Sequence, residues 1–132
     1  DNDLMNVKGL AYYGSGKSAE FISILKKQVE KNPQDADSWF NLGVMLSKDD
    51  ATKKEAEMDF NKALEIKPTY IGALKNLTQL KIGDDDKTRA DYEVARKAGK
   101  MDVANKILDE RKARFLTALP YAEKCMHLHQ MI

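Results

Sequence analysis

The segment closest to a known chemical motif lies near the start of the 132-residue sequence. Residues 11–18 read Ala-Tyr-Tyr-Gly-Ser-Gly-Lys-Ser, and the final Gly-Lys-Ser is how a phosphate-binding loop ends. Such a loop needs a strand before it and a helix after it, so that backbone amides converge on the phosphate. Residues 4–13 instead have a helical pattern, and Ala11 stands where the motif needs glycine. A turn that matches the motif by coincidence is favoured, and an enzyme or nucleotide binder that uses the Lys17 loop is the remote alternative.

Cys125, His127 and His129 are the residues whose types could bind a metal ion. On a helix Cys125 and His129 lie one turn apart, whereas His127 points to the opposite side. Two ligands do not make a site, and the chain has no other histidine. We therefore expect no metal site. Cys125 is predicted to fill a small core position, with both histidines facing solvent or a neighbouring helix pair.

Asp84, Asp85 and Asp86 form the densest acidic cluster of the chain. They lack the spaced ligands and the trailing glutamate of a calcium loop, and they are typical of a turn that caps a helix. No other grouping of residues indicates catalysis. We expect a protein without catalytic residues, metal or cofactor, and not an enzyme.

Composition narrows the classes of partner. The 22 Lys and Arg residues nearly balance 21 Asp and Glu residues, so a net charge of +1 creates no field that gathers nucleic acid or anionic lipid. No apolar run approaches the roughly 20 residues that cross a bilayer. One cysteine excludes an internal disulfide, and seven Gly with three Pro disfavour a sandwich of many tight turns. We expect no nucleic-acid partner and no membrane insertion.

An internal repeat organises the chain. Pro33 and Pro68 lie 35 residues apart, and Asn41-Leu42 recurs as Asn76-Leu77 at the same spacing. Within one repeat, two sets of residues each follow the spacing of a single helical face: Trp39, Leu42, Gly43 and Leu46, then Ala56, Phe60, Ala63 and Leu64. Each unit is therefore predicted to be a pair of helices. Thr52-Lys-Lys-Glu55 predicts a capping box, in which Thr52 accepts from the Glu55 amide at the start of the second helix.

The second unit resembles the tetratricopeptide repeat. It reads Trp39-Phe-Asn-Leu-Gly-Val-Met-Leu46, then has Ala56, Phe60, Ala63 and Pro68 at the family's spacing. The resemblance implies an all-α fold: a right-handed α-solenoid of about three stacked helix pairs, whose concave face holds peptides or partner proteins. It predicts a single domain over residues 1–132, with units at about 2–35, 36–69 and 70–131.

The third unit is predicted to be interrupted by a helical insertion over residues 83–117. Its two helices are lengthened into an antiparallel hairpin, with a break near 83–86 and a corner at Gly99-Lys100. Pro120 is expected to kink the second long helix. Residues 118–124 resemble a subgroup of repeat proteins that is common in Bacteroidetes, many of them exported.

The resemblance also implies a binding face on the first helix of each unit. By alignment this concave face comprises Asn6, Leu10, Tyr13, Phe40, Asn41, Val44, Ser47, Lys75 and Gln79. Asn41 matches an asparagine that the family uses to hold a ligand. Phe40 and Tyr13 would favour an extended or helical segment with apolar side chains, unless they only close the packing between units. We expect an interaction module for an unidentified protein or peptide. The alternative is a self-assembling element that forms a homo-oligomer through its uncapped ends or the long hairpin.

Overall fold

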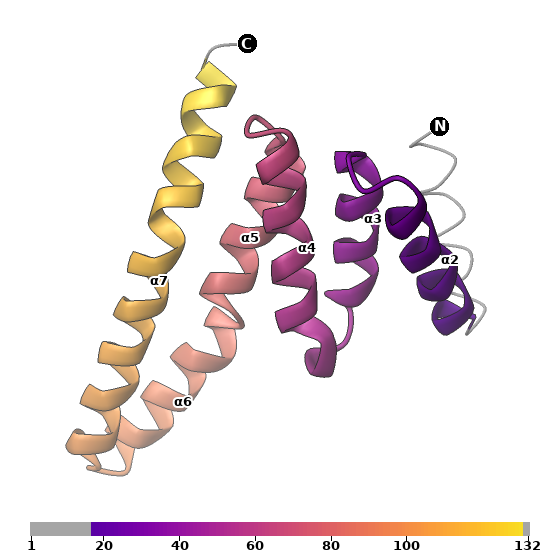
Figure 1. Cartoon of the computed structure of the whole chain (residues 1–132). Coiled ribbons are helices and arrows are strands. Elements are labelled where there is room, and N and C mark those ends of the chain that lie inside the picture. The colour runs from indigo at the N-terminus through magenta and orange to yellow at the C-terminus, as the bar shows by residue number, and fades with distance from the viewer. Residues whose placement is uncertain (1–16, 131–132) are drawn as a thin grey trace. The chain divides into compact units, whose positions relative to one another are not determined.

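The protein is built from α-helices joined by short turns (Figure 1). The computed structural model describes residues 17–130. In chain order these residues form α2 (Ser18–Lys31), α3 (Ala36–Leu46), the short 3-10 helix η1 (Asp50–Thr52), α4 (Lys53–Ile66), α5 (Ile71–Ile82), α6 (Asp85–Lys97) and α7 (Met101–Gln130). Residues 17–130 contain no strand, so the predicted all-α class is confirmed, and the succession of helix pairs agrees with an α-solenoid. The helix predicted over residues 4–13 lies outside this range.

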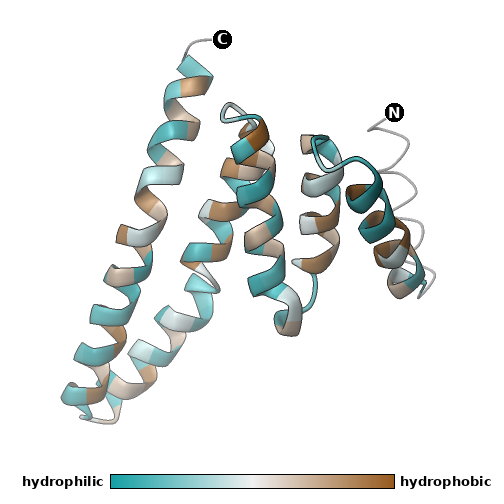
Figure 2. Ribbon diagram, viewed as in Figure 1, coloured by the Kyte–Doolittle hydropathy of each residue, from teal (hydrophilic) through white to brown (hydrophobic). Residues whose placement is uncertain are grey.

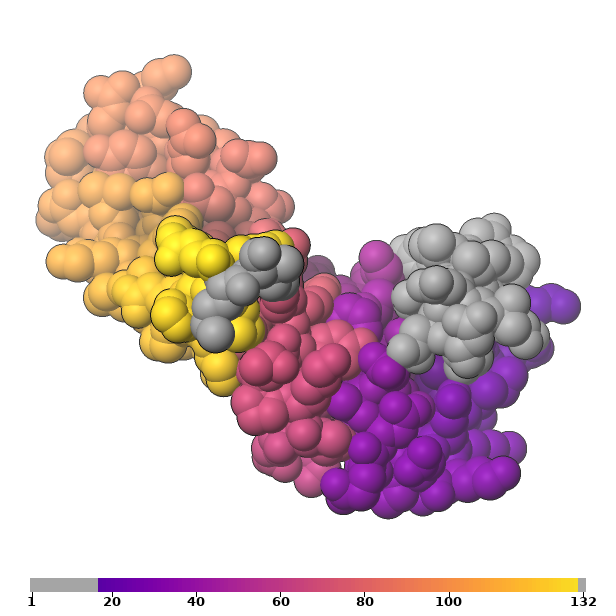
Figure 3. Space-filling view, turned by 90° about the horizontal axis from the view of Figure 1, so that it is seen from above, coloured from indigo at the N-terminus to yellow at the C-terminus, as the bar shows by residue number. Residues whose placement is uncertain are grey.

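The chain divides into two compact units, residues 1–76 and residues 77–132, with the division inside α5. In the first unit, α3 packs against both α2 and α4, and Figure 3 shows the side chains of this unit, coloured indigo to magenta, in contact with one another. Its buried apolar side chains recur at helical spacing on each helix: Phe21, Leu25, Val29, Leu42, Met45, Leu46, Ala56, Phe60, Ala63, Ala73 and Leu74. Burial of one face of each helix is what the repeat pattern predicted.

Gly43 lets α3 and α4 approach closely. A Cβ atom at this position would lie 2.8 Å from the ring of Phe60, closer than carbon atoms pack. Phe60 itself is fully buried. The glycine of the repeat signature is therefore required by the space that the phenylalanine of the next helix occupies.

Two side-chain hydrogen bonds hold the turn that leads into α3. The Trp39 indole donates to the carbonyl oxygen of Pro33 at 2.9 Å. The Ser38 hydroxyl donates to the Asp35 carboxylate at 2.5 Å. These bonds tie the first turn of α3 to the residues before it, and so set the direction in which the helix begins.

The predicted capping box at Thr52 is wrong. The Thr52 hydroxyl donates to the carbonyl oxygens of Leu46, at 2.6 Å, and Asp49, at 3.2 Å, and no side chain caps the start of α4. The reason is the turn η1, in which the Asp49 carboxylate accepts from the Ala51 amide. This turn places Thr52 next to the C-terminal end of α3. Its hydroxyl therefore donates to carbonyl oxygens earlier in the chain and does not accept from the Glu55 amide.

In the second unit, α6 and α7 form a helical hairpin. Gly83, with φ +70°, lies in the turn between α5 and α6. Gly99, with φ +72°, lies in the turn between α6 and α7. At this corner the Lys100 amide donates to Ala95 and the Gly99 amide donates to Arg96, which is a Schellman ending. The break and the corner fall where the sequence predicted them.

Small residues occupy the buried positions of α6 and α7. Ala95 of α6 and Ala104, Ala118 and Cys125 of α7 are buried. Pro120 lies inside α7, which runs continuously from Met101 to Gln130. His127 and His129 are exposed, as predicted.

Candidate functional site

One side of α3 in the first unit carries half-buried residues and is our candidate for a binding surface. Asp37, Phe40, Val44 and Ser47 follow the spacing of one helical face, and each is half-buried. We call these four residues the open side of α3. Ser47 lies at the end of this row of residues. Its hydroxyl donates a hydrogen bond of 2.7 Å to the Val44 carbonyl, so its donor is already satisfied within α3.

Phe40 is held in place by two other rings. The centre of the Phe40 ring lies 5.8 Å from that of Phe60 and 4.9 Å from that of Tyr70. In both pairs the ring planes are tilted, an arrangement that is favourable for aromatic rings. A Cβ at Gly72, in the first turn of α5, would lie 3.0 Å from the Phe40 ring. Phe40 therefore packs between successive helix pairs, which supports the packing role and leaves part of its ring at the surface.

Tyr70 and Asp37 join this cluster. The Tyr70 hydroxyl donates to Asp37 at 2.5 Å. Burial raises the pKa of Tyr70 above its usual value, and the hydrogen bond to Asp37 raises it further. The Lys67 ammonium lies 5.6 Å from the centre of the Tyr70 ring. Neither Tyr70 nor Asp37 was among the residues predicted for the binding face. In the sequence, Tyr70 could be noticed only as an aromatic residue two positions after Pro68, and Asp37 only as an acid in the first turn of a predicted helix.

The other residues predicted for the binding face lie in different environments. Asn41 is only 7% exposed, so little of its amide reaches the surface. Lys75 and Gln79 are exposed and lie one turn apart on α5, Lys75 in the first unit and Gln79 in the second. Asn6, Leu10 and Tyr13 lie outside the described residues, as do residues 11–16 of the loop that resembles a phosphate site.

Asp59 is an acid buried in the first unit. It is 7% exposed, and within residues 17–130 its Oδ2 atom has no hydrogen-bond partner. Burial raises the pKa of Asp59 to about 7; nearby Glu55 adds to the rise and Lys26 opposes it. Glu55 and Lys26 pair with each other at 3.0 Å between α4 and α2. Because Lys26 pairs with Glu55, its charge offsets the burial of Asp59 only in part.

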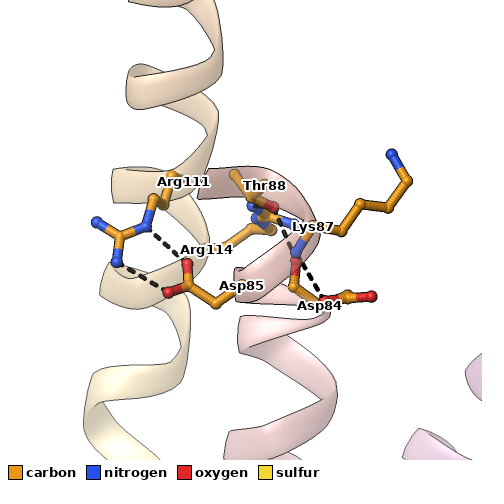
Figure 4. A network of polar contacts seen from close by, with 6 residues as sticks. All are labelled: Asp84, Asp85, Lys87, Thr88, Arg111 and Arg114. Carbon is orange, nitrogen blue, oxygen red and sulfur yellow. Dashed lines mark hydrogen bonds and ion pairs between the residues drawn. The ribbon is translucent and has the colours of Figure 1, made fainter. Parts of the chain in front are cut away.

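Polar contacts join α6 to α7 (Figure 4). Arg111 donates two hydrogen bonds to Asp85, at 2.6 and 2.9 Å, and Arg114 donates to the Thr88 hydroxyl at 2.6 Å. Asp84 accepts from the Lys87 amide at 2.9 Å, which confirms that the acidic cluster caps a helix. The pKa of Asp85 is lowered, chiefly by its hydrogen bond to Arg111. This network fixes the register of the hairpin.

Two further features bear on function. Within residues 17–130, no three His, Cys, Asp or Glu side chains come together in a way that could hold a metal ion. The same range has no helix with the length and hydropathy needed to traverse a bilayer.

The comparisons with known proteins point to one helix pair. Residues 36–70 match the family model of the tetratricopeptide repeat. This range begins at the first residue of α3, contains α4, and ends at Tyr70. The chain has no match among curated proteins. Residues 36–70, which carry the open side of α3 and the rings behind it, therefore form a tetratricopeptide repeat.

Proposed function

We propose that this protein is a non-catalytic interaction module that binds a segment of a partner protein along the open side of α3. The observation that carries the proposal is the match of residues 36–70 to a repeat whose members characteristically bind proteins. Half-buried Phe40 and Val44 supply apolar surface at the same place.

The rings behind this surface make it rigid. Phe60 and Tyr70 fix the Phe40 side chain, and the Tyr70 bond to Asp37 fixes the first turn of α3. A surface that is ordered before binding loses little conformational entropy when it binds. Phe40 therefore offers a pre-ordered apolar contact, and Val44, which is not part of the ring cluster, offers a second one on the same side of α3.

Exposed Lys75 adds a charge from the first half of α5. We propose a ligand that is extended or helical, with apolar side chains for Phe40 and Val44 and an acidic group for Lys75. The binding face predicted from the sequence also includes Asn6, Leu10, Tyr13 and Gln79, and these residues remain part of the proposal.

Two finer assignments belong to the same proposal. We propose that α5 and α7 are the two helices of a third unit, with residues 83–117 as its insertion. The relation to exported repeat proteins of Bacteroidetes rests on residues 118–124 alone.

The test is selection of peptides from a displayed library on the intact chain, followed by affinity measurements on two variants. Val44→Arg places a charge on the open side of α3. Met58→Arg places the same charge on α4, where Met58 is 70% exposed. We expect Val44→Arg to weaken the selected peptides about tenfold or more and Met58→Arg to leave them unchanged. Equal affinities for Val44→Arg and the unmodified chain would remove the open side of α3 as the binding surface.

A further inference from the structure

An exposed row of apolar side chains runs along α7. Its members are Met101, Leu108, Phe115, Leu119 and Met126, with exposed fractions of 49, 40, 38, 46 and 63%. At 100° per residue they lie within about 40° of one another around the helix axis, and the row is about 38 Å long. Figure 2 shows hydrophobic residues recurring along the whole of this helix. We call these five residues the α7 row.

The hairpin does not use this row. The buried residues Ala104, Ala118 and Cys125 lie on the side of α7 that is centred roughly 80° away around the helix. Arg111, which binds Asp85 of α6, lies on that side as well. A contiguous apolar surface of several hundred square ångströms on a small protein marks an interaction site more often than not.

The spacing of the row fits a second copy of the same helix. Lys112 lies within the same strip of the helix, and with it the residues are spaced 7, 4, 3, 4 and 7 apart. This spacing reads the same in both directions. In an antiparallel two-fold pair each contact between residues i and j is made twice, so a symmetric spacing brings the residues of one row opposite those of the other.

We propose that the α7 row binds the α7 row of a second copy of this chain, with the two helices antiparallel. About the midpoint of the row, Met101 faces Met126 of the second copy and Leu108 faces its Leu119, so four of the five apolar residues meet another one. The interface is independent of the open side of α3 and does not rest on the proposed function.

The charges near the row act both for and against this pairing. Lys112 faces Phe115 of the second copy, whose ring already carries the Arg111 guanidinium at 4.9 Å within its own chain. A cation can approach the remaining face of such a ring favourably. Glu123 lies near Asn105 of the second copy, which offers amide donors to the carboxylate. The two Lys112 residues lie about 4.5 Å apart along the helix axes, and their repulsion opposes the pairing.

The area is sufficient for a specific contact. The row and the neighbouring Leu116, which is 58% exposed, present on the order of 500 Å² of apolar side-chain surface per copy. Two copies would cover roughly 1,000 Å², the lower bound for a specific interface, before the stems of Lys112 and Glu123 are counted.

Sedimentation of the full chain from micromolar to millimolar concentration tests the proposal. We expect the unmodified chain to reach a dimer, Leu119→Glu to remain a monomer, and Val103→Glu to behave like the unmodified chain. Val103 is a matched control, because it is 49% exposed on the opposite side of α7. A monomer at every concentration would overturn the proposal, as would equal loss of the dimer in both variants. Peptide binding by Leu119→Glu should be unchanged, which separates this proposal from the one for α3.

Cross-linking tests the antiparallel register. In chains with Cys125→Ala, protomers carrying Leu108→Cys are mixed with protomers carrying Leu119→Cys and treated with a short bifunctional maleimide. We expect cross-links between the two kinds of protomer and few within either kind, since two copies of position 108 would lie about 16 Å apart along the helix axes. Efficient cross-linking of Leu108→Cys protomers to each other would mean parallel helices and contradict the proposal.

Discussion

The Tyr70 hydroxyl donates a hydrogen bond of 2.5 Å to Asp37, 33 residues earlier in the chain. The bond joins the residue before α5 to the first turn of α3, on the surface where we place the ligand. It links one helix pair to the start of the next, and Phe40 lies against the same tyrosine ring.

Tyr70→Phe removes this bond and keeps the ring. We expect the free energy of unfolding of the first unit to fall by about 1 kcal/mol, the net value of a partly buried hydrogen bond. Urea unfolding followed by the fluorescence of Trp39, the single tryptophan, measures it. In a double-mutant cycle with Asp37→Ala the two losses should not add, and additive losses would show that the bond contributes nothing.

Gly43→Ala should destabilise the first unit although alanine favours helices. The added Cβ would lie 2.8 Å from the Phe60 ring, and overpacking of a core typically costs about 1–3 kcal/mol. The helix propensity gained is only about 1 kcal/mol, so a net loss is expected. Thermal unfolding measures it, and Phe60→Leu in the same chain should reduce the cost of Gly43→Ala. An unchanged or higher melting temperature for Gly43→Ala would contradict the close approach of α3 and α4.

The buried Asp59 predicts an unusual dependence of stability on pH. Because its pKa is raised to about 7, the folded state holds a proton that the unfolded state releases near pH 4. This carboxyl therefore lowers stability progressively as the pH rises from about 4 to about 7, with no further loss above that range. Asp59→Asn should be more stable than the unmodified chain by about 2 kcal/mol at pH 8, and the two should converge near pH 4. Denaturant unfolding of both proteins at pH 4 and pH 8 measures this difference. If the free energy of unfolding depended on pH in the same way in both proteins, the burial of the Asp59 carboxyl would be contradicted.

The Arg111 contact to Asp85 should hold the start of α6 in place. Arg111→Met removes both hydrogen bonds at once, together with the contact to the Phe115 ring. Hydrogen exchange measured by mass spectrometry should then quicken several-fold over residues 85–97. Lys106→Met is the control, because the contact of Lys106 within the described part of the chain is an exposed one of 3.9 Å with Glu110 of its own helix. Equal exchange in both variants would show that the network does not fix the hairpin.

Most of the fold could be predicted from the sequence because it is encoded locally. The apolar periodicity of α3 and α4 follows directly from the face that each helix buries. The corner at Gly99 and the cap at Asp84 depend on residues within one turn of each position. Features of this kind need no knowledge of the tertiary arrangement.

The contacts that define the candidate site were harder to predict. Tyr70 meets Asp37 across 33 residues, and nothing in the local pattern of either residue requires the other. The burial of Asp59 breaks the usual preference of acids for the surface. At Thr52 the sequence predicted a capping box, but the hydroxyl instead donates to the Leu46 carbonyl at the end of α3.

The central claim is that a ligand binds along the open side of α3, and the most direct measurement is a map of backbone amide shifts. The intact chain, labelled with ¹⁵N, is titrated with a peptide selected from the displayed library. The account predicts that the largest changes fall at Phe40, Val44, Ser47 and Lys75 and are lost in Val44→Arg. Changes centred instead on the exposed face of α4 around Met58, and retained in Val44→Arg, would contradict it.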